Sequence, residues 1–215
     1  IPVYNQVEYT KKCLTSVFEH GNDVSYEVII ADDASTDGTK NLASYARNAV
    51  IVRGSGNVGY IRNCNSAARR ARGKYLYFLN NDVVVREGWL SALVETFERH
   101  KDAGVVGSRV VRPDGTLQEC GVYVFADGFR TCIVADPCLD MNSYFKKADY
   151  VSGCSLMTPA RLFRDIGGFD ERFSPAYCDD PDYCLEAARR GFCVYVQPRS
   201  EIIHFGSQSY EGRSE

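Results

Sequence analysis

Acidic and amide side chains cluster at three points of the sequence: Asp32-Asp33, Asn80-Asn81-Asp82 and Cys178-Asp179-Asp180-Pro181-Asp182. Carboxylate and amide oxygens are the ligands that Mg²⁺ and Mn²⁺ prefer, and phosphate oxygens commonly complete their coordination. A carboxylate can also take the proton of a hydroxyl group that attacks a reacting carbon. The three clusters therefore suit a metal-assisted reaction on a substrate that carries phosphates.

Asp33 follows the apolar residues 28–31 and is expected in a turn after a buried strand. Its carboxylate could accept hydrogen bonds from a nucleobase N–H or a ribose hydroxyl. Asp32 and Asp33 could equally serve only to cap the turn before the next helix. Position alone leaves both interpretations open.

Asp82 would supply one metal-binding oxygen at the end of a strand. Departure of a diphosphate builds negative charge, which a divalent ion can neutralise. The Asn-Asn-Asp sequence is also common in ordinary turns, so this cluster is a weak signal when taken alone.

Asp180 lies where a helix that ends near Arg190 is expected to begin. The dipole of a helix N-terminus favours an ionised carboxylate, as a general base requires. For the segment alone, acids that merely cap the helix are the simpler interpretation. His204 ends a strand-like run and could bind Mn²⁺ through a neutral imidazole, although a lone histidine is more often structural.

The run Gly54-Ser55-Gly56-Asn57-Val58-Gly59 matches the dinucleotide-binding pattern G-x-G-x-x-G. An NAD-dependent oxidoreductase is therefore one alternative. Three features count against it. A strand, helix, strand and helix already precede the run, whereas the pattern usually opens its domain. Arg53 stands where the buried strand should end, and Asp82 lies late for the ribose-binding acid.

Apolar periodicity predicts the elements that must position these residues. In the first half, the expected strands and helices alternate: strands at 1–4, 27–31, 49–52 and 74–79, and helices at 8–19, from Ser35 or Thr36 to 46, at 60–72 and at 89–97. This alternation predicts an α/β fold with a mostly parallel central sheet flanked by helices. Ligands bind beyond the carboxyl ends of such strands, so the polar residues at 4–5, 32–33 and 80–82 should converge.

The second half predicts a smaller, less regular part of the same domain. We expect a hairpin from strands at 105–111 and 117–125, a strand at 150–157, a helix begun by Pro159 and a helix at 180–190. Residues 126–148 have no firm periodicity and are expected to form a variable insert.

Composition and charge narrow the class of protein. The 215 residues are 45% apolar and 25% charged with a net charge of −3, which is typical of a globular protein and predicts no nucleic-acid partner. The apolar runs are too short to span a membrane. Nine cysteines without a C-x-x-C pair favour buried thiols rather than a zinc site, and they favour a cytoplasmic location. Any attachment to the cytosolic face of a membrane is expected to come from parts of the protein outside these residues. A chain that begins at Ile1 is expected to be a piece of a longer protein.

In their order, these segments resemble the family 2 glycosyltransferases over nearly the whole chain apart from residues 126–148. The residues that carry the resemblance are Ile1-Pro2-Val3-Tyr4-Asn5, residues 28–39, Asn57-Val58-Gly59, Asn65, residues 71–76, Leu79-Asn80-Asn81-Asp82, residues 167–171, Asp179-Asp180 and His204-Phe205-Gly206.

The resemblance implies a single GT-A domain, with a nucleotide-sugar-binding half over about 1–110 and an acceptor half over about 111–215. It implies an inverting enzyme that transfers a sugar from a nucleotide-diphosphate donor, with UDP first and dTDP second, to an acceptor hydroxyl. The acceptor remains open among a glycan, a lipid-linked glycan and a glycoprotein. The expected cofactor is Mn²⁺ or Mg²⁺.

Site residues follow from the resemblance position by position. Nucleotide-sugar-binding residues are expected at Pro2, Tyr4, Asn5, Asp33, Asn57, Gly59, Asn65, Asn80 and Asn81. Metal ligands are expected at Asp82 and His204. Asp180 matches the catalytic base, with Asp179 beside it.

The sequence departs from the family pattern at Asn80, which replaces the first acid of D-x-D and leaves the metal site with one negative charge fewer. Asparagine at this position is familiar among rhamnosyl-type members. Pro181 is uncommon at its position but suits the first turn of a helix. A nucleotide-sugar-binding module without turnover is the other alternative, and it would have no use for Asp180.

Overall fold

The computed structural model describes residues 1–21, 24–46, 48–127, 130–132 and 144–206. Most of the expected insert, including Cys138, lies outside the described residues, as does the side chain of Cys132. In the described part of the chain, no helix is both long and apolar enough to cross a membrane.

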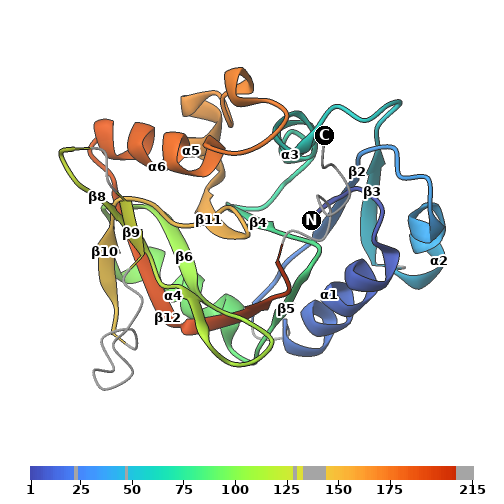
Figure 1. Ribbon diagram of the computed structural model, residues 1–215, viewed down its shortest axis with the longest axis horizontal. Coiled ribbons are helices and arrows are strands. Elements are labelled where there is room, and N and C mark those ends of the chain that lie inside the picture. Colours follow the sequence, from blue (N-terminus) through green and yellow to red (C-terminus); the bar gives the residue numbers. More distant parts are fainter. Residues whose placement is uncertain (22–23, 47, 128–129, 133–143, 207–215) are drawn as a thin grey trace.

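Helices and strands alternate over the first half of the chain, and the α/β class predicted from the sequence is confirmed (Figure 1). The helices are α1 (Val7–His20), α2 (Leu42–Tyr45), α3 (Tyr60–Ala68), α4 (Trp89–Arg99), α5 (Ala160–Ile166) and α6 (Asp179–Arg189), with 3₁₀ turns η1 (Gly38–Asn41) and η2 (Glu171–Phe173). The strands are β1 (Pro2–Val3), β2 (Val28–Asp32), β3 (Ala49–Arg53), β4 (Tyr75–Leu79), β5 (Val83–Val85), β6 (Ala103–Val111), β7 (Leu117–Glu119), β8 (Val122–Val124), β9 (Arg130–Cys132), β10 (Lys146–Ala148), β11 (Ser155–Pro159) and β12 (Cys193–His204).

The described strands form two main sheets of different pairing. The first, in the order β1-β2-β3, is parallel throughout. The second has the path β10-β12-β6-β11-β4, to which β5 and β7 attach at β12 and β6. Here only β6 and β12 pair in parallel, so the mostly parallel arrangement expected from the sequence applies to the first sheet. Among the described antiparallel pairs of this sheet, only β6 and β7 are consecutive in the chain. The other antiparallel partners are far apart in sequence, so the alternation of elements along the chain does not reveal their direction.

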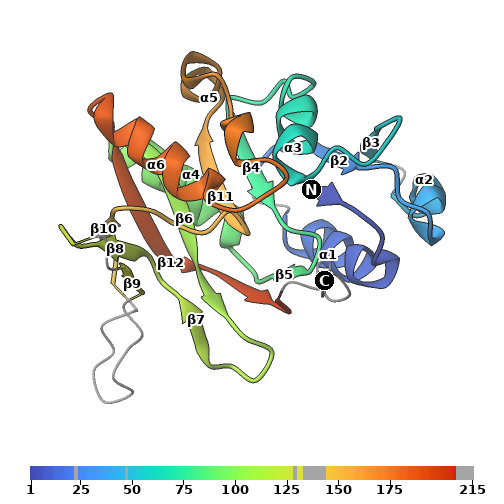
Figure 2. The ribbon, with the colours of Figure 1, turned by 45° about the horizontal axis from the view of Figure 1, so that its top comes forward.

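The second sheet lies between two apolar cores. Successive side chains of a strand point to opposite faces, and on β4 Leu76 and Phe78 pack with α3, α5 and α6, whereas Leu79 packs with α1 and α4. Figure 2 shows α3, α5 and α6 along the same side of the sheet. Burial of large apolar side chains contributes roughly 1.5–3 kcal/mol each, so these two cores hold the layers together.

The antiparallel pairing of β5 with the end of β12 joins the middle of the chain to its last described strand. His204 lies opposite Val83 in this ladder, and the Phe205 N–H donates to the Asp82 carbonyl oxygen at 2.9 Å. The loop after β4 and the end of β12 are therefore fixed side by side.

Several predicted bounds need correction. Asp37, rather than Ser35 or Thr36, caps the helical segment after β2, because its carboxylate accepts from the Thr39 N–H, and the α-helical part covers only four residues. The Ser35 hydroxyl instead accepts from the Asn5 N–H at 2.8 Å. The predicted helix 60–72 ends at Ala68, and the strand predicted at 150–157 begins only at Ser155.

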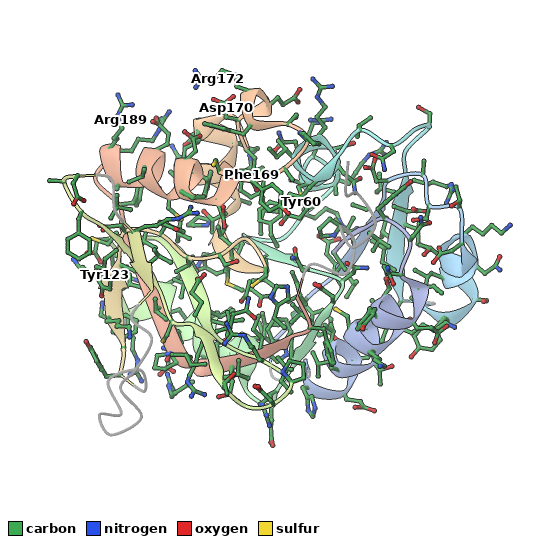
Figure 3. The ribbon with its side chains drawn as sticks, viewed as in Figure 1. Tyr60, Tyr123, Phe169, Asp170, Arg172 and Arg189 are labelled. Atoms are coloured by element: carbon green, nitrogen blue, oxygen red, sulfur yellow. The ribbon has the colours of Figure 1, made fainter. Side chains whose placement is uncertain are left out.

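Asn65 joins α3 to the segment before η2. Its Nδ2 donates to the Phe169 carbonyl oxygen at 2.8 Å, and its Oδ1 accepts from the Phe169 N–H at 2.9 Å. Phe169 is buried against Phe78, Phe163 and Tyr183 and lies within the layer of α5 and α6 (Figure 3). The amide of Asn65 therefore satisfies backbone groups that an apolar core would leave without partners.

We expect Asn65→Ala to lower the free energy of unfolding by about 1–3 kcal/mol, because it leaves a buried N–H and a buried C=O unpaired. Ser66→Ala, one position further along α3, is the matched control and should change stability little. Urea unfolding of both variants measures the difference. Unchanged stability of Asn65→Ala together with weakened UDP binding would instead place Asn65 in a nucleotide site.

Candidate active site

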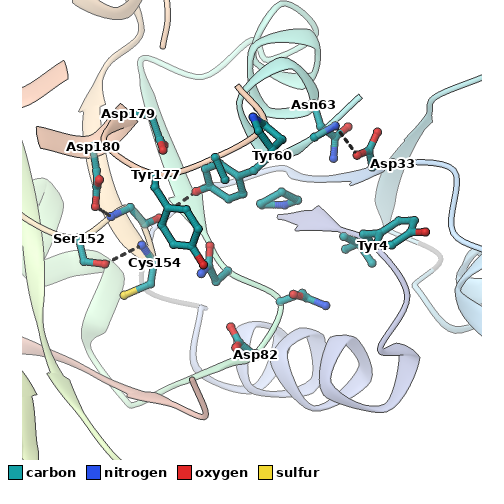
Figure 4. A pocket seen from close by; sticks show the side chains of 18 of the residues that line it. Tyr4, Asp33, Tyr60, Asn63, Asp82, Ser152, Cys154, Tyr177, Asp179 and Asp180 are labelled. Atoms are coloured by element: carbon teal, nitrogen blue, oxygen red, sulfur yellow. Dashed lines mark hydrogen bonds between the residues drawn. The ribbon is translucent and has the colours of Figure 1, made fainter. Parts of the chain in front are cut away.

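One cleft collects most of the residues that the sequence singles out (Figure 4). Its volume is about 270 Å³. The predicted site residues among its lining are Pro2, Tyr4, Asp33, Asn57, Gly59, Asn80, Asn81, Asp82, Asp179, Asp180 and His204. Asn5 and Asn65 are not among the lining residues. The ends of β1, β2, β4 and β12 and the start of α6 thus meet at the same place.

Asp33 is buried at the wall of the cleft and is held by two backbone donors. The Val58 N–H donates to Oδ1 at 2.8 Å, and the Gly59 N–H donates to Oδ2 at 2.9 Å. Each carboxylate oxygen can accept a further hydrogen bond, so the group is oriented without being saturated. Its neighbour Asp32 is used internally, because it pairs with Arg53 and accepts from the Ser35 N–H.

The glycine run that matches the dinucleotide pattern provides those donors. Gly59 has a φ of +86°, and a Cβ there would lie 2.7 Å from Cβ of Pro175, so only glycine fits. The N–H groups of Val58 and Gly59 face the chain's own carboxylate instead of a bound pyrophosphate. This geometry does not support the NAD-binding alternative.

Asp82 and His204 lie together because of the β5–β12 pairing. His204 Nε2 is 3.3 Å from Asp82 Oδ1, and both residues are buried. The contact is close, but its geometry is not that of a hydrogen bond, and Nε2 has no hydrogen-bond partner within the described residues. Asn80 Oδ1 is likewise buried without a partner there. The His204 ring and the Asp82 carboxylate are therefore neighbours in a cleft whose lining also includes Asn80.

Asn81 and Asn5, both predicted to contact the nucleotide, make hydrogen bonds that organise the protein. Asn81 lines the cleft, but its Nδ2 donates to the Thr10 hydroxyl of α1 at 3.0 Å. Asn5 Oδ1 accepts from the Thr36 N–H at 2.8 Å and ties the end of β1 to the loop after β2. Asn5 also adopts a left-handed backbone with φ of 57°, which asparagine tolerates.

Asp180 lies in the first turn of α6 on the other side of the cleft. Its Oδ2 accepts from the Gly153 N–H at 2.9 Å. The Tyr60 hydroxyl donates to the Gly153 carbonyl oxygen at 3.2 Å, so the residue whose N–H holds Asp180 is itself held. Figure 4 shows Asp180 across the cleft from Asp33, with Asp82 between them at its floor.

Burial shifts Asp179 and Asp180, at the start of α6, toward the protonated form. Loss of solvent, with repulsion from Asp180 second, raises the pKa of Asp179 to about 6. Loss of solvent also raises the pKa of Asp180, which the hydrogen bond from Gly153 partly offsets. A carboxylate with a raised pKa is a stronger base once it is ionised.

Sequence reasoning missed several residues at or beside the cleft. Tyr60 and Ser152 line it without any motif to mark them. Tyr177 is 64% exposed at its edge, and both Tyr177 and Cys178 adopt left-handed backbones, with φ of 76° and 63°. Gln118 contacts His204 and Glu119 accepts from the Ser152 N–H at 2.8 Å. For Gln118 and Glu119, the only signal in the sequence was that two polar residues are adjacent in a short strand.

Comparison with known proteins defines the class. Among solved structures, the fold is similar to GalNAc-T7 with UDP, GalNAc and Mn²⁺, with a TM-score of 0.78 and 13% identity over 94% of this chain and 42% of that chain. It is also similar to the mannosyltransferase PcManGT from Pyrobaculum calidifontis in complex with GDP-Man and Mn²⁺, with a TM-score of 0.72 and 20% identity over 97% and 56% of the two chains. The fold is therefore that of the GT-A glycosyltransferases, as the sequence predicted.

The sequence profile of glycosyl transferase family 2 matches residues 1–157. The O-antigen biosynthesis protein RfbC of Myxococcus xanthus is 33% identical over 67% of this chain, which spans only 12% of that protein. The N-acetylglucosaminyl-diphospho-decaprenol L-rhamnosyltransferase of Mycobacterium tuberculosis is 25% identical over 85% of this chain and 67% of that protein. The chain belongs to glycosyl transferase family 2, and it is a glycosyltransferase domain.

Glu119 gives a test of the electrostatics around the cleft. Loss of solvent raises its pKa from 4.5 to about 7. The folded state therefore holds the proton more tightly than the unfolded state, and the resulting stability is present below pH 4.5 and lost as the pH rises through about 7. Glu119→Gln keeps an oxygen for the Ser152 N–H but cannot ionise.

Relative to Glu119→Gln, we expect the native chain to lose about 1–3 kcal/mol of unfolding free energy between about pH 4.5 and pH 8.5. The full pKa shift of Glu119 sets the upper limit of this loss of unfolding free energy, because part of the side chain remains accessible to water. Urea unfolding at the two pH values measures the loss. The exposed Glu87→Gln is the control: it retains Glu119 and should lose stability with rising pH as the native chain does. Identical pH dependence of Glu119→Gln and the native chain would refute the assignment.

Proposed function

We propose that this chain is the catalytic domain of an inverting glycosyltransferase that moves a sugar from a nucleotide diphosphate to an acceptor hydroxyl. The observation that supports this most is the arrangement of Asp33, Asp82 with His204, and Asp180 around one cleft. These groups suit, in that order, the nucleoside, the diphosphate and the attacking hydroxyl. The whole protein's activity, substrates and partners belong to this proposal, because the chain spans 12% of RfbC.

A divalent ion, Mn²⁺ or Mg²⁺, fits the group formed by Asp82, His204 and Asn80. The buried His204 Nε2 and Asn80 Oδ1 have no hydrogen-bond partner within the described residues, and the Asp82 carboxylate lies beside His204. Within the same part of the chain, no cluster of three or more His, Cys, Asp or Glu residues could hold a metal. Few protein ligands are usual for Mg²⁺-type sites that share the ion with phosphates. Bound there, the ion would neutralise charge on the departing diphosphate.

Asp180 is the proposed general base. Its carboxylate would take the proton of the acceptor hydroxyl while the hydroxyl oxygen bonds to the anomeric carbon. The bond from that carbon to the diphosphate oxygen breaks on the opposite side, and its electron pair leaves with the diphosphate. One displacement of this kind inverts the anomeric configuration. The Gly153 N–H keeps Asp180 aimed at the cleft throughout.

Asp33 and Tyr4 are the proposed contacts of the nucleoside, with Pro2, Asn57 and Gly59 around it. Asp33 keeps accepting capacity beyond its two backbone donors, which suits a base N–H or a ribose hydroxyl. UDP is the first candidate nucleotide and dTDP the second. The rhamnosyltransferase among the relatives makes a rhamnosyl donor the first sugar to test.

The acceptor side of the cleft would be formed by the second half of the chain, about 111–215, and the donor side by about 1–110. A glycan, a lipid-linked glycan and a glycoprotein are the acceptor classes to test. We propose a cytoplasmic location on the chemistry of the thiols: Cys13, Cys64, Cys154 and Cys184 form no disulfide and are buried, as small apolar side chains would be.

Asp180→Asn is expected to lower the rate of transfer by about 10²–10⁴-fold, because an amide cannot accept the hydroxyl proton. Donor binding should remain within a few-fold of the native value, because the amide oxygen of the variant can still accept a hydrogen bond from the Gly153 N–H. Asp182→Asn, in the same turn of α6, is the matched control and should transfer normally. Near-native transfer by Asp180→Asn would remove this residue from the role of base.

Binding of UDP should depend on a divalent ion and on Asp82. We expect UDP with Mn²⁺ to raise the melting temperature of the native chain more than UDP alone, because a ligand that binds only the folded state stabilises it. Asp82→Asn should lose the part that Mn²⁺ adds and keep the smaller rise from UDP alone. An equal rise with and without Mn²⁺ would contradict the metal site.

Measurable hydrolysis of the donor would exclude a binding module without turnover.

A further inference from the structure

The side chain of Gln118 contacts the Nδ1 side of the His204 ring. Its Nε2 lies 2.9 Å from His204 Nδ1. Gln118 belongs to β7, which pairs with β6 so that Val110 lies opposite Glu119. Neighbouring residues of a strand face opposite ways, and Glu119 is turned to the Ser152 N–H while Gln118 is turned to His204.

The orientation of the Gln118 amide and the tautomer of His204 depend on each other, and in this structure the amide nitrogen faces Nδ1. An amide nitrogen can only donate, so Nδ1 must accept, and a neutral imidazole then bears its hydrogen on Nε2. That hydrogen faces the Asp82 side of the cleft, where Oδ1 lies 3.3 Å from Nε2. In this form Nε2 has no lone pair to give to a metal.

The same amide can also hold the opposite form. Rotation by a half turn exchanges its nitrogen for its oxygen with almost no change in shape. The amide oxygen would then accept a hydrogen bond from Nδ1–H. Nε2 would carry no proton, and its lone pair would point toward Asp82. Histidines that bind metals usually donate their other ring N–H to an oxygen in this way.

We propose that Gln118 is a positioning residue that sets the tautomer of His204, with the amide nitrogen toward Nδ1 in one form and the amide oxygen toward Nδ1 when a divalent ion takes Nε2. The ring stays neutral in both forms: one proton moves from Nε2 to Nδ1 by way of water, and the amide turns over. The inference rests on the proposed metal-dependent function and adds a residue that acts only through His204.

Glutamine suits this role because it is both a donor and an acceptor. Glutamate could only accept, so it would fix the hydrogen on Nδ1 and keep Nε2 ready for a metal. Leucine fills a similar space but does neither. A purely structural role for Gln118 predicts that both substitutions harm the site, whereas tautomer control predicts that they differ.

The direct test is the ¹⁵N spectrum of the histidine rings of the native chain. The three histidines are distinguished with the variant His204→Asn. Without added metal, His204 should show its hydrogen on Nε2, and saturation with Mg²⁺ and UDP should move the hydrogen to Nδ1. His20 and His100 serve as internal controls and should not change.

The second test is the affinity for Mn²⁺ in the presence of UDP, measured by electron paramagnetic resonance of the free ion. Gln118→Leu should weaken Mn²⁺ binding by about 10- to 100-fold, the usual effect of losing the hydrogen bond that orients a metal-binding histidine. Gln118→Glu should bind at least as tightly as the native chain. Thr116→Glu adds a charge in the same hairpin without touching His204, and it measures the contribution of charge alone.

Several results would overturn the proposal. A His204 hydrogen that stays on the same nitrogen while Mg²⁺ and UDP bind would refute tautomer control and leave the transferase assignment standing. Equal losses in Gln118→Leu and Gln118→Glu would reduce Gln118 to a structural role, and an equal gain in Thr116→Glu and Gln118→Glu would reduce its effect to charge. If the native chain binds neither Mn²⁺ nor Mg²⁺ with UDP, the proposed function fails as well.

Discussion

The pairing of β5 with the end of β12 is the constraint on which the site depends. It is a ladder of backbone hydrogen bonds between segments from the middle and the end of the chain, and it brings His204 beside Asp82. Two buried polar groups of this kind would be unfavourable if held apart in an apolar core. The ladder fixes them at a short distance, and the apolar layers on both faces of the sheet keep the ladder in place.

A second feature recurs on both walls of the cleft: backbone N–H groups hold the acids. Val58 and Gly59 orient Asp33, and Gly153 orients Asp180. A backbone donor belongs to the fold and cannot swing away as a lysine or arginine could. It also brings no positive charge to the carboxylate, so an ionised carboxylate is not neutralised by a neighbouring side chain. Burial then raises the pKa of Asp180, which makes it a stronger base once ionised.

Local pattern was sufficient to predict most elements of the first half. The convergence of Asp33 and Asp82 was also predicted, but the two residues follow strands of different sheets, β2 and β4, rather than neighbouring parallel strands of one sheet. Asp180 could be predicted as a candidate because a run of acids at the start of an expected helix is recognisable in the sequence. Asn65 and Asn5 were assigned to the nucleotide, but their amides bond to backbone groups remote in sequence, and no local pattern reveals such partners. Gln118 and Glu119 were not predicted as site residues for a related reason. Their importance comes from the residues that the three-residue strand β7 faces, which lie far away in the sequence.

The mixed pairing of the second sheet also lay beyond local pattern. The side-chain pattern of β11 and β12 does not reveal whether their neighbours run parallel or antiparallel. Only the connections decide, and these run through segments with weak periodicity. The sequence therefore predicts the class of fold and the donor side more fully than the acceptor side.

The most direct test of the central claim is to titrate the ¹⁵N-labelled chain with Mn²⁺ and UDP and to record which backbone amide signals the paramagnetic ion broadens. If the cleft holds a nucleotide-bound ion between Asp82, His204 and Asp180, the signals of Val83, Phe205 and Gly153 should disappear first, while those of α2 and β10 persist. Broadening centred on any other part of the chain, or none that depends on UDP, would contradict the account.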